Sequence, residues 1–192
     1  MTRGVATIEA PMNRATSRRG LGRRTTSWDA DEALEQLYAA HWRSLVRLGV
    51  LLLHDQGRAE EVVQDSFVAM HNHWHRLHDP AKALAYLRQT VVNRSRSVLR
   101  HQVVVDRQAA HDRPLVAPDG ADDRARREAV LDALRALPAR QREVIALRYY
   151  IDLSEQEIAE TLGISRGAVK SHASRGAASL RERLADLWEE TP

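Results

Sequence analysis

Apolar residues recur at intervals of three and four along most of this 192-residue chain, and this spacing constrains its fold more than any other feature. Residues spaced in this way form a single stripe along an α-helix. No segment shows the strict alternation of apolar and polar residues that a half-buried strand requires. The sequence therefore predicts an all-α protein. The first such stripe consists of Leu34, Leu37, Tyr38, Trp42, Leu45, Leu48 and Leu52.

The composition favours helices as well. Hydrophobic residues make up 43% of the chain and aromatic residues only 5%, whereas β-sandwiches draw on β-branched and aromatic side chains. The chain has no Cys, which excludes disulfides and Cys-ligated zinc. It shows neither an apolar run of membrane-spanning length nor a secretion signal. We therefore expect a cytoplasmic protein without membrane insertion.

The domain organisation follows from where the periodicity stops. The first residues are rich in Arg, Gly, Ser and Thr and carry no apolar pattern. Residues 104–124 lose the periodicity too, and they collect two prolines, a glycine and five aspartates, a composition typical of linkers. We therefore predict two small helical domains, over 28–103 and 127–188, with a disordered basic tail over 1–27 and a flexible linker over 104–126.

The sharpest local signal is a helix-turn-helix near the C-terminus. Ser154 and Glu157 have the spacing of a capping box, in which each side chain bonds the backbone of the other residue at a helix start. Gly163 follows one helix later and suits the left-handed conformation of a tight turn. Ser165 is then the expected N-cap of a second helix. The spacing predicts two short helices joined by a turn.

The second of these helices has the side chains of a DNA-reading element. Residues 165–183 hold five Lys or Arg against one acidic residue, Glu182. Arg and Lys pair with phosphates or guanine edges, and Ser contacts either. A solvated helical hairpin is the alternative, but capping, turn and packing positions all agree with a DNA-binding unit. The candidate DNA contacts are Arg166, Lys170, Ser171, His172 and Arg175.

Signatures of an enzyme are missing from the sequence. It contains no phosphate-cradling glycine loop, no Gly-x-Ser-x-Gly elbow and no His-Glu-x-x-His, so we expect neither catalysis nor a cofactor. His71, His75 and His78 recur at spacings of four and three, which neutral imidazoles in a zinc site can also have. Because no Cys supports such a site, we expect these histidines to face solvent or DNA, and we predict no metal.

Motifs in both domains together resemble one known family. Residues 59–67 are similar to region 2.2 of extracytoplasmic-function sigma factors, and residues 85–94 to regions 2.3 and 2.4. Residues 137–144 and 167–172 are similar to regions 4.1 and 4.2. The motifs occur in the family's order. The chain thus resembles an RNA polymerase sigma factor of the sigma-70 family, closest to a sigma-E-like subgroup common in actinobacteria.

The resemblance implies a role for each domain in transcription initiation. The first domain would dock on the clamp helices of the largest subunit of core RNA polymerase through Glu61, Gln64 and Asp65. The second would contact the polymerase flap and read the −35 element of promoter DNA with the helix-turn-helix residues above. An anti-sigma factor is a possible further partner. The −10 element would be bound, and DNA opening promoted, by Arg88, Asn93, Arg94 and Arg96, with His78 and Lys82 in the loop that would hold a flipped base.

Two other functions remain as alternatives. A free-standing helix-turn-helix regulator would bind palindromic DNA as a dimer without polymerase, which leaves the motifs at 59–67 and 85–94 unexplained. A protein that sequesters polymerase would bind the core enzyme without depending on Asn93 or Lys170.

Overall fold

The computed structural model describes residues 25–77, 79–105 and 121–185. These residues form helices and contain no strand, so the predicted all-α class is confirmed. His78 and almost all of the predicted N-terminal tail lie outside the described residues, as do residues 106–120 of the predicted linker. The elements are α1 (Thr25–Leu53), α2 (Gln56–His73), η1 (Trp74–Arg76), η2 (Pro80–Lys82), α3 (Ala83–Val105), α4 (Ala121–Arg135), α5 (Ala139–Ile145), η3 (Ala146–Tyr150), α6 (Glu155–Leu162) and α7 (Arg166–Arg183).

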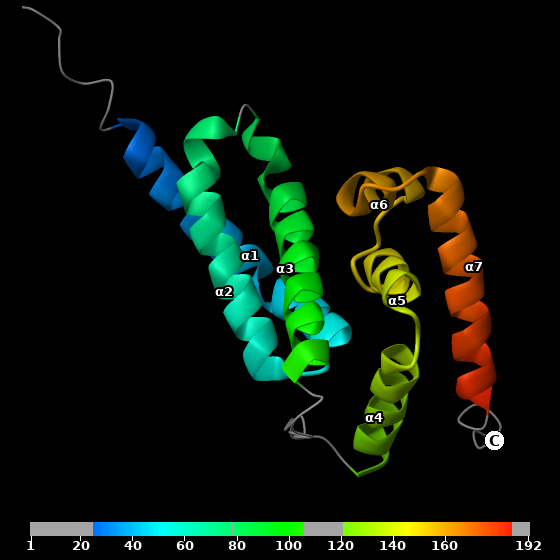
Figure 1. Cartoon of the computed structure of the whole chain (residues 1–192). Coiled ribbons are helices and arrows are strands. Elements are labelled where there is room, and N and C mark those ends of the chain that lie inside the picture. The colour runs from blue at the N-terminus through cyan, green and yellow to red at the C-terminus, as the bar shows by residue number, and fades with distance from the viewer. Residues whose placement is uncertain (1–24, 78, 106–120, 186–192) are drawn as a thin grey trace, which may run out of the picture.

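Helices α1, α2 and α3 form the first helical unit (Figure 1). The predicted stripe of α1 supplies its core: Leu45, Leu48 and Leu52 are buried against residues of α2 and α3. Gly49 allows α1 and α2 to approach closely, because a Cβ atom at this position would lie 2.9 Å from the Cβ of Ala59. The aromatic ring of Tyr38 stacks on that of Trp42 at 4.6 Å and widens the same contact surface.

Only two residues, His54 and Asp55, separate α1 from α2. His54 takes a positive φ of 59°, and Asp55 is already the N-cap of α2, its side chain accepting a hydrogen bond from the backbone of Arg58. The turn therefore places His54 at the end of the bundle that faces the second unit.

Helices α4 to α7 form the second unit (Figure 1). Pro138 is the N-cap of α5, with backbone angles of φ −53° and ψ 140°. The helix continues through a π-helical turn, η3, to Tyr150. Helix α7 crosses α5 closely at Gly176, where a Cβ atom would lie 2.9 Å from Cγ1 of Ile145.

The two units pack against each other. One continuous apolar cluster contains buried residues of both, such as Leu52 and Leu87 of the first unit and Leu147 and Val169 of the second. Helix α3 lies next to α6, and the end of α1 next to η3, α5 and α4 (Figure 1). The sequence motifs predicted the two units but gave no indication of this contact. Among the described helices, none is long and apolar enough to cross a membrane.

Candidate nucleic-acid interface

The helix-turn-helix forms as its capping residues predict. The backbone N–H of Ser154 donates to Oε2 of Glu157 at 2.9 Å, and the backbone N–H of Glu157 donates to Oγ of Ser154 at 3.3 Å. These bonds from Ser154 hold the pKa of the Glu157 carboxyl below its usual value. Gly163 ends α6 with φ +64°, and Ser165 caps α7 by accepting from the backbone N–H of Ala168 at 3.1 Å. The capping box and the turn glycine are confirmed.

Packing then fixes α7 relative to α6. Val169 and Ile158 are completely buried, and Ala159 is the small residue at the crossing. The apolar anchor of α7 is therefore directed inward, and the opposite side of the helix is left for a ligand.

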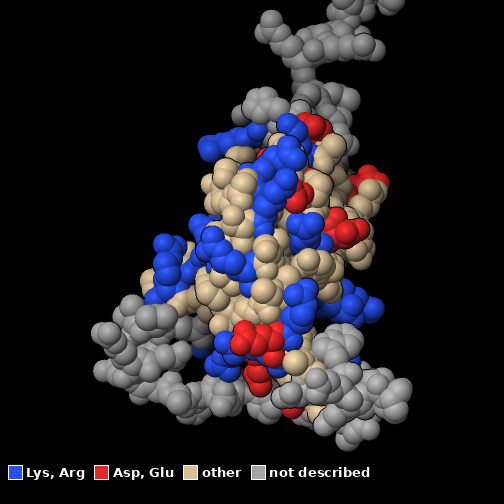
Figure 2. Space-filling view, turned by 90° about the vertical axis from the view of Figure 1, so that its right-hand side faces the viewer, with Lys and Arg blue, Asp and Glu red and all other residues tan. Residues whose placement is uncertain are grey.

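The exposed part of α7 carries most of the predicted −35 contacts. Arg166, Lys170, Ser171 and Arg175 are exposed, whereas His172 is half-buried and its Nδ1 atom has no hydrogen-bond partner among the described residues. Figure 2 shows this side of the molecule, with Lys and Arg side chains spread over much of its surface. The structure thus leaves four of the five predicted residues of α7 exposed to solvent.

Lys170 has an acidic neighbour on this surface. Its Nζ lies 3.8 Å from Oε2 of Glu155, whose other oxygen is 3.3 Å from Nη1 of Arg148. Glu155 comes from the first turn of α6, so one carboxylate joins both helices of the motif to η3. The sequence analysis did not single out Glu155, because its partners are set by how α6 and α7 cross. Because exposed ion pairs contribute little free energy, this contact does not prevent Lys170 from binding a ligand.

The predicted −10 residues of α3 do not share one free surface. Asn93 is exposed, and Arg94 donates from Nη1 to Oδ2 of Asp65 at 2.8 Å. Arg88 is half-buried, and this burial lowers its pKa, partly offset by the nearby charge of Glu157 on α6. Helix α3 therefore directs Arg94 toward α2 and Arg88 toward the second unit.

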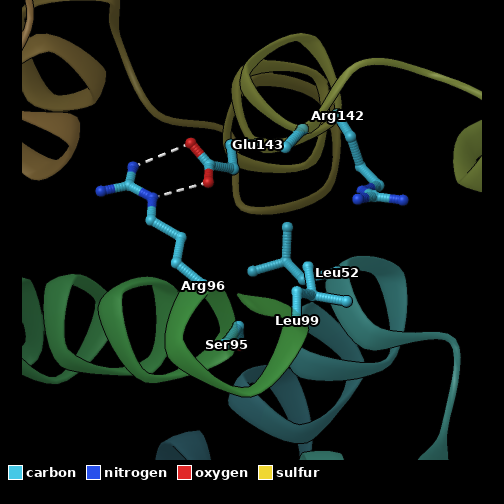
Figure 3. A pocket seen from close by; sticks show the side chains of 7 residues that line it. Leu52, Ser95, Arg96, Leu99, Arg142 and Glu143 are labelled. Carbon is cyan, nitrogen blue, oxygen red and sulfur yellow. Dashed lines mark hydrogen bonds and ion pairs between the residues drawn. The ribbon is translucent and has the colours of Figure 1, made fainter. Parts of the chain in front are cut away.

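Arg96 is the most constrained of these residues. It donates from Nε to Oε1 of Glu143 at 2.6 Å and from Nη2 to Oε2 at 2.8 Å (Figure 3). Its Nη1 donates to Oδ1 of Asn93 at 3.0 Å. Each guanidinium nitrogen thus has a partner, and two of these bonds cross from α3 to α5. Glu143 lies within the motif at 137–144, but the sequence did not identify it as a site residue, because its spacing does not reveal a partner 47 residues away.

The loop between α2 and α3 contains the remaining −10 candidates. Lys82 is exposed at the end of η2. Asp79 organises this turn, as its carboxylate accepts from the backbone N–H of Ala81 at 3.0 Å and its carbonyl from that of Lys82, also at 3.0 Å. The ring of His73 stacks on that of Tyr86 at 4.8 Å and ties the end of α2 to α3.

The predicted polymerase contacts lie on the outer side of α2. Glu61, Gln64 and Asp65 are all exposed and follow one another at helical spacing. The ion pair of Asp65 with Arg94 connects this surface to α3.

Of the three regularly spaced histidines, His71 and His75 are exposed, and His78 lies outside the described residues. Nε2 of His71 lies 3.2 Å from Oδ1 of Asp31, and His73 stacks on Tyr86. Within the part of the chain that the structure describes, no three His, Cys, Asp or Glu residues come together in a way that would hold a metal ion.

Comparison with known proteins places both units in one family. Residues 37–103 match the model of Sigma-70 region 2, and residues 127–180 match that of Sigma-70, region 4. The RNA polymerase sigma-E factor of Streptomyces coelicolor is 31% identical over 73% of this chain and 80% of its own length. The ECF RNA polymerase sigma factor SigL of Mycobacterium tuberculosis is 31% identical, over 80% of this chain and 90% of its own.

A solved structure has the same arrangement of helices. CnrH, determined in complex with the cytosolic domain of CnrY, aligns with a TM-score of 0.63 at 28% identity, over 85% of this chain and 97% of its own.

Proposed function

Because the chain belongs to the extracytoplasmic-function RNA polymerase sigma factors, we propose that its two units divide the recognition of a promoter between them. The chain is a sigma factor that binds core RNA polymerase, recognises the −35 and −10 elements and promotes transcription initiation. One observation carries the proposal: a helix-turn-helix with an exposed basic helix and a three-helix unit with its own sigma motifs occur in one chain.

The second unit would read the −35 element through α7. Arg166, Lys170, Ser171 and Arg175 are exposed on this helix, whereas its anchor Val169 is buried. A helix presented in this way fits the major groove, where Arg and Lys recognise guanine edges and Ser contacts bases or phosphates. His172 is half-buried, so we expect it to support the helix rather than to reach a base.

The first unit would bind the −10 element through α3 and the loop before it. Asn93 offers both a donor and an acceptor to an unstacked base, and Lys82 at the end of η2 offers a charge to the backbone. Arg96 would pair with a phosphate in the forked geometry that it now adopts with Glu143.

The acidic side of α2 would dock on the clamp helices of the largest polymerase subunit, and the second unit on the flap. Glu61, Gln64 and Asp65 supply exposed negative and polar groups for such a contact. The chain would work without catalysis of its own, in the cytoplasm where polymerase acts, and an anti-sigma factor would be a suitable regulator. CnrH, which was solved with a cytosolic protein domain bound, supports a partner of that kind.

Reversal of charge on α2 tests the docking. We expect Glu61→Lys to weaken capture of the chain by core polymerase by at least about tenfold if the contact is electrostatic. Glu35→Lys, an equal change at an exposed position of α1, is the matched control and should bind normally. Equal binding by both variants would contradict the assignment of this surface to polymerase.

A further inference from the structure

The contact between the two units is made by the residues that promoter DNA would need. The carboxylate of Glu143 accepts two hydrogen bonds from the fork of Arg96 (Figure 3). The third guanidinium nitrogen, Nη1, donates to Oδ1 of Asn93. The Glu143 side chain is 5% exposed and that of Arg96 23% exposed. Both −10 candidates therefore have partners within the protein, although Asn93 stays exposed.

Glu143 has the chemistry of a phosphate substitute at this site. Arginine binds carboxylates and phosphates with the same pair of parallel N–H donors. A second guanidinium, that of Arg140, reaches Oε2 of Glu143 at 3.0 Å. One carboxylate thus lies between two arginines, in the position that a backbone phosphate would take, and the two ligands exclude each other.

Further contacts hold the same closed arrangement. Arg142, the neighbour of Glu143, donates from Nη1 to Nε2 of His54 at 2.9 Å, and so connects α5 to the end of α1. Leu52 and Leu99 of the first unit line a small pocket beneath the Arg96–Glu143 pair (Figure 3). The apolar cluster that both units share, which includes Leu52 and Leu147, adds to these contacts, so separation of the units also exposes apolar surface to water.

A cleft beside the pair gives DNA a way in. It has a volume of about 700 Å³, and its lining includes Asn93, Arg96, Arg100, Arg140 and Glu143. Arg100 is exposed, and the side chain of Arg140 is 43% exposed. A phosphate that enters the cleft would meet these two cations before it displaces the carboxylate.

We propose that Glu143 closes the chain on itself, by occupying the Arg96 fork so that binding of −10 DNA requires α5 to leave α3. This inference rests on the proposed −10 role of α3. It assigns to Glu143 a regulatory contact: the chain masks its own DNA-binding side chains until polymerase, DNA or another partner separates the units.

The test measures opening and DNA binding in the same variants. The chain has no Cys, so dyes can be attached at Ala40→Cys on α1 and Ala178→Cys on α7 to follow the distance between the units by energy transfer. The DNA probe is a fluorescent single strand of random sequence, roughly 20 nucleotides long, since phosphate contacts do not depend on sequence. Glu143→Ala should lower energy transfer and tighten binding of this strand by about tenfold.

Two further variants separate opening from misfolding. Glu160→Ala removes an exposed carboxylate of α6 that accepts a hydrogen bond from Nε2 of Gln156 on the same helix, and it should change neither signal. The double exchange Arg96→Glu with Glu143→Arg should restore the closed distance without restoring tight DNA binding, because Arg96 is gone. Closure in this double variant shows that the ion pair, rather than either residue alone, makes the difference between the open and the closed chain.

The proposal is overturned if Glu143→Ala leaves energy transfer unchanged, or if the units separate and DNA binding does not tighten. Failure of the proposed function has a different signature. An opened chain that binds DNA tightly yet never supports transcription by core polymerase would contradict the sigma assignment while leaving the closing role of Glu143 intact.

Discussion

Nε2 of His54 accepts a hydrogen bond of 2.9 Å from Nη1 of Arg142 and thereby joins the end of α1 to α5. Burial, and then the charges of Arg142 and Arg135, lower the pKa of His54 from 6.5 to about 4. The imidazole is therefore neutral in the native protein at neutral pH, which it must be to act as the acceptor.

This relationship predicts a pH-dependent stability. Between pH 6.5 and about 4, unfolded His54 binds a proton that native His54 does not, so the free energy of unfolding falls as the pH falls through this window. We expect a loss of about 1–2 kcal/mol, since solvent screens part of the shift. Urea unfolding followed by circular dichroism across the window measures it.

Two variants assign the effect to His54. His54→Asn keeps a residue that tolerates positive φ and should flatten this part of the pH dependence. His101→Asn, at an exposed position of α3, is the control variant and should unfold with the same dependence as the parent chain. An unchanged slope in His54→Asn would show that other groups are responsible.

The crossing of α1 and α2 predicts a steric cost at Gly49. An added Cβ would lie 2.9 Å from that of Ala59, so Gly49→Ala should lower the free energy of unfolding by about 1–3 kcal/mol. Gly167→Ala is the matched control, because its Cβ would meet nothing closer than Oγ of Ser165 at 3.9 Å. That change should be neutral or slightly stabilising in thermal unfolding, and a similar loss in both variants would contradict the close crossing.

The capping box predicts a local contribution to the helix-turn-helix. Ser154→Ala removes the acceptor for the Glu157 backbone N–H and should destabilise the chain by about 0.5–2 kcal/mol in urea unfolding. Ser174→Ala, at an exposed position within α7, should change the stability by no more than about 0.5 kcal/mol. If the two variants were equally stable, the box would be structurally present but energetically unimportant.

The outer side of α7 predicts a sequence-dependent loss of promoter recognition. Lys170→Ala and Arg175→Ala should each weaken binding by about 1–3 kcal/mol where the residue makes a bidentate base contact, and only at promoters with the contacted −35 sequence. Arg183→Ala, two turns beyond Arg175 on the same helix, is the control. Transcription from promoters with single −35 substitutions measures the loss, and output that is unchanged in all variants would refute this recognition surface.

Local features of the fold were predictable from the sequence, because they depend on neighbours along the chain. The apolar spacing predicted the helices. Ser154 marked the start of α6, and Gly163 and Ser165 marked the two ends of the turn in the helix-turn-helix. Each capping side chain bonds the backbone of a residue only three positions further along the chain, so the sequence alone identifies the pair.

Pairings between distant helices could not be predicted in this way. The sequence analysis placed Arg94 and Arg96 together at one DNA-binding surface, but Arg94 pairs with Asp65 and Arg96 with Glu143. The carboxylate that each arginine pairs with depends on how the helices pack, and the spacing of residues along α3 does not reveal this packing. The predicted contacts with DNA and polymerase stay predictions, as do the domain boundaries.

The most direct test of the account is in vitro transcription with purified chain and sigma-free core polymerase, using pooled fragments of the source genome as template. The account predicts discrete start sites that appear only when both components are present, preceded by shared −35 and −10 sequences. Tight DNA binding by the chain alone, without any such transcripts, would contradict it and indicate a free-standing regulator.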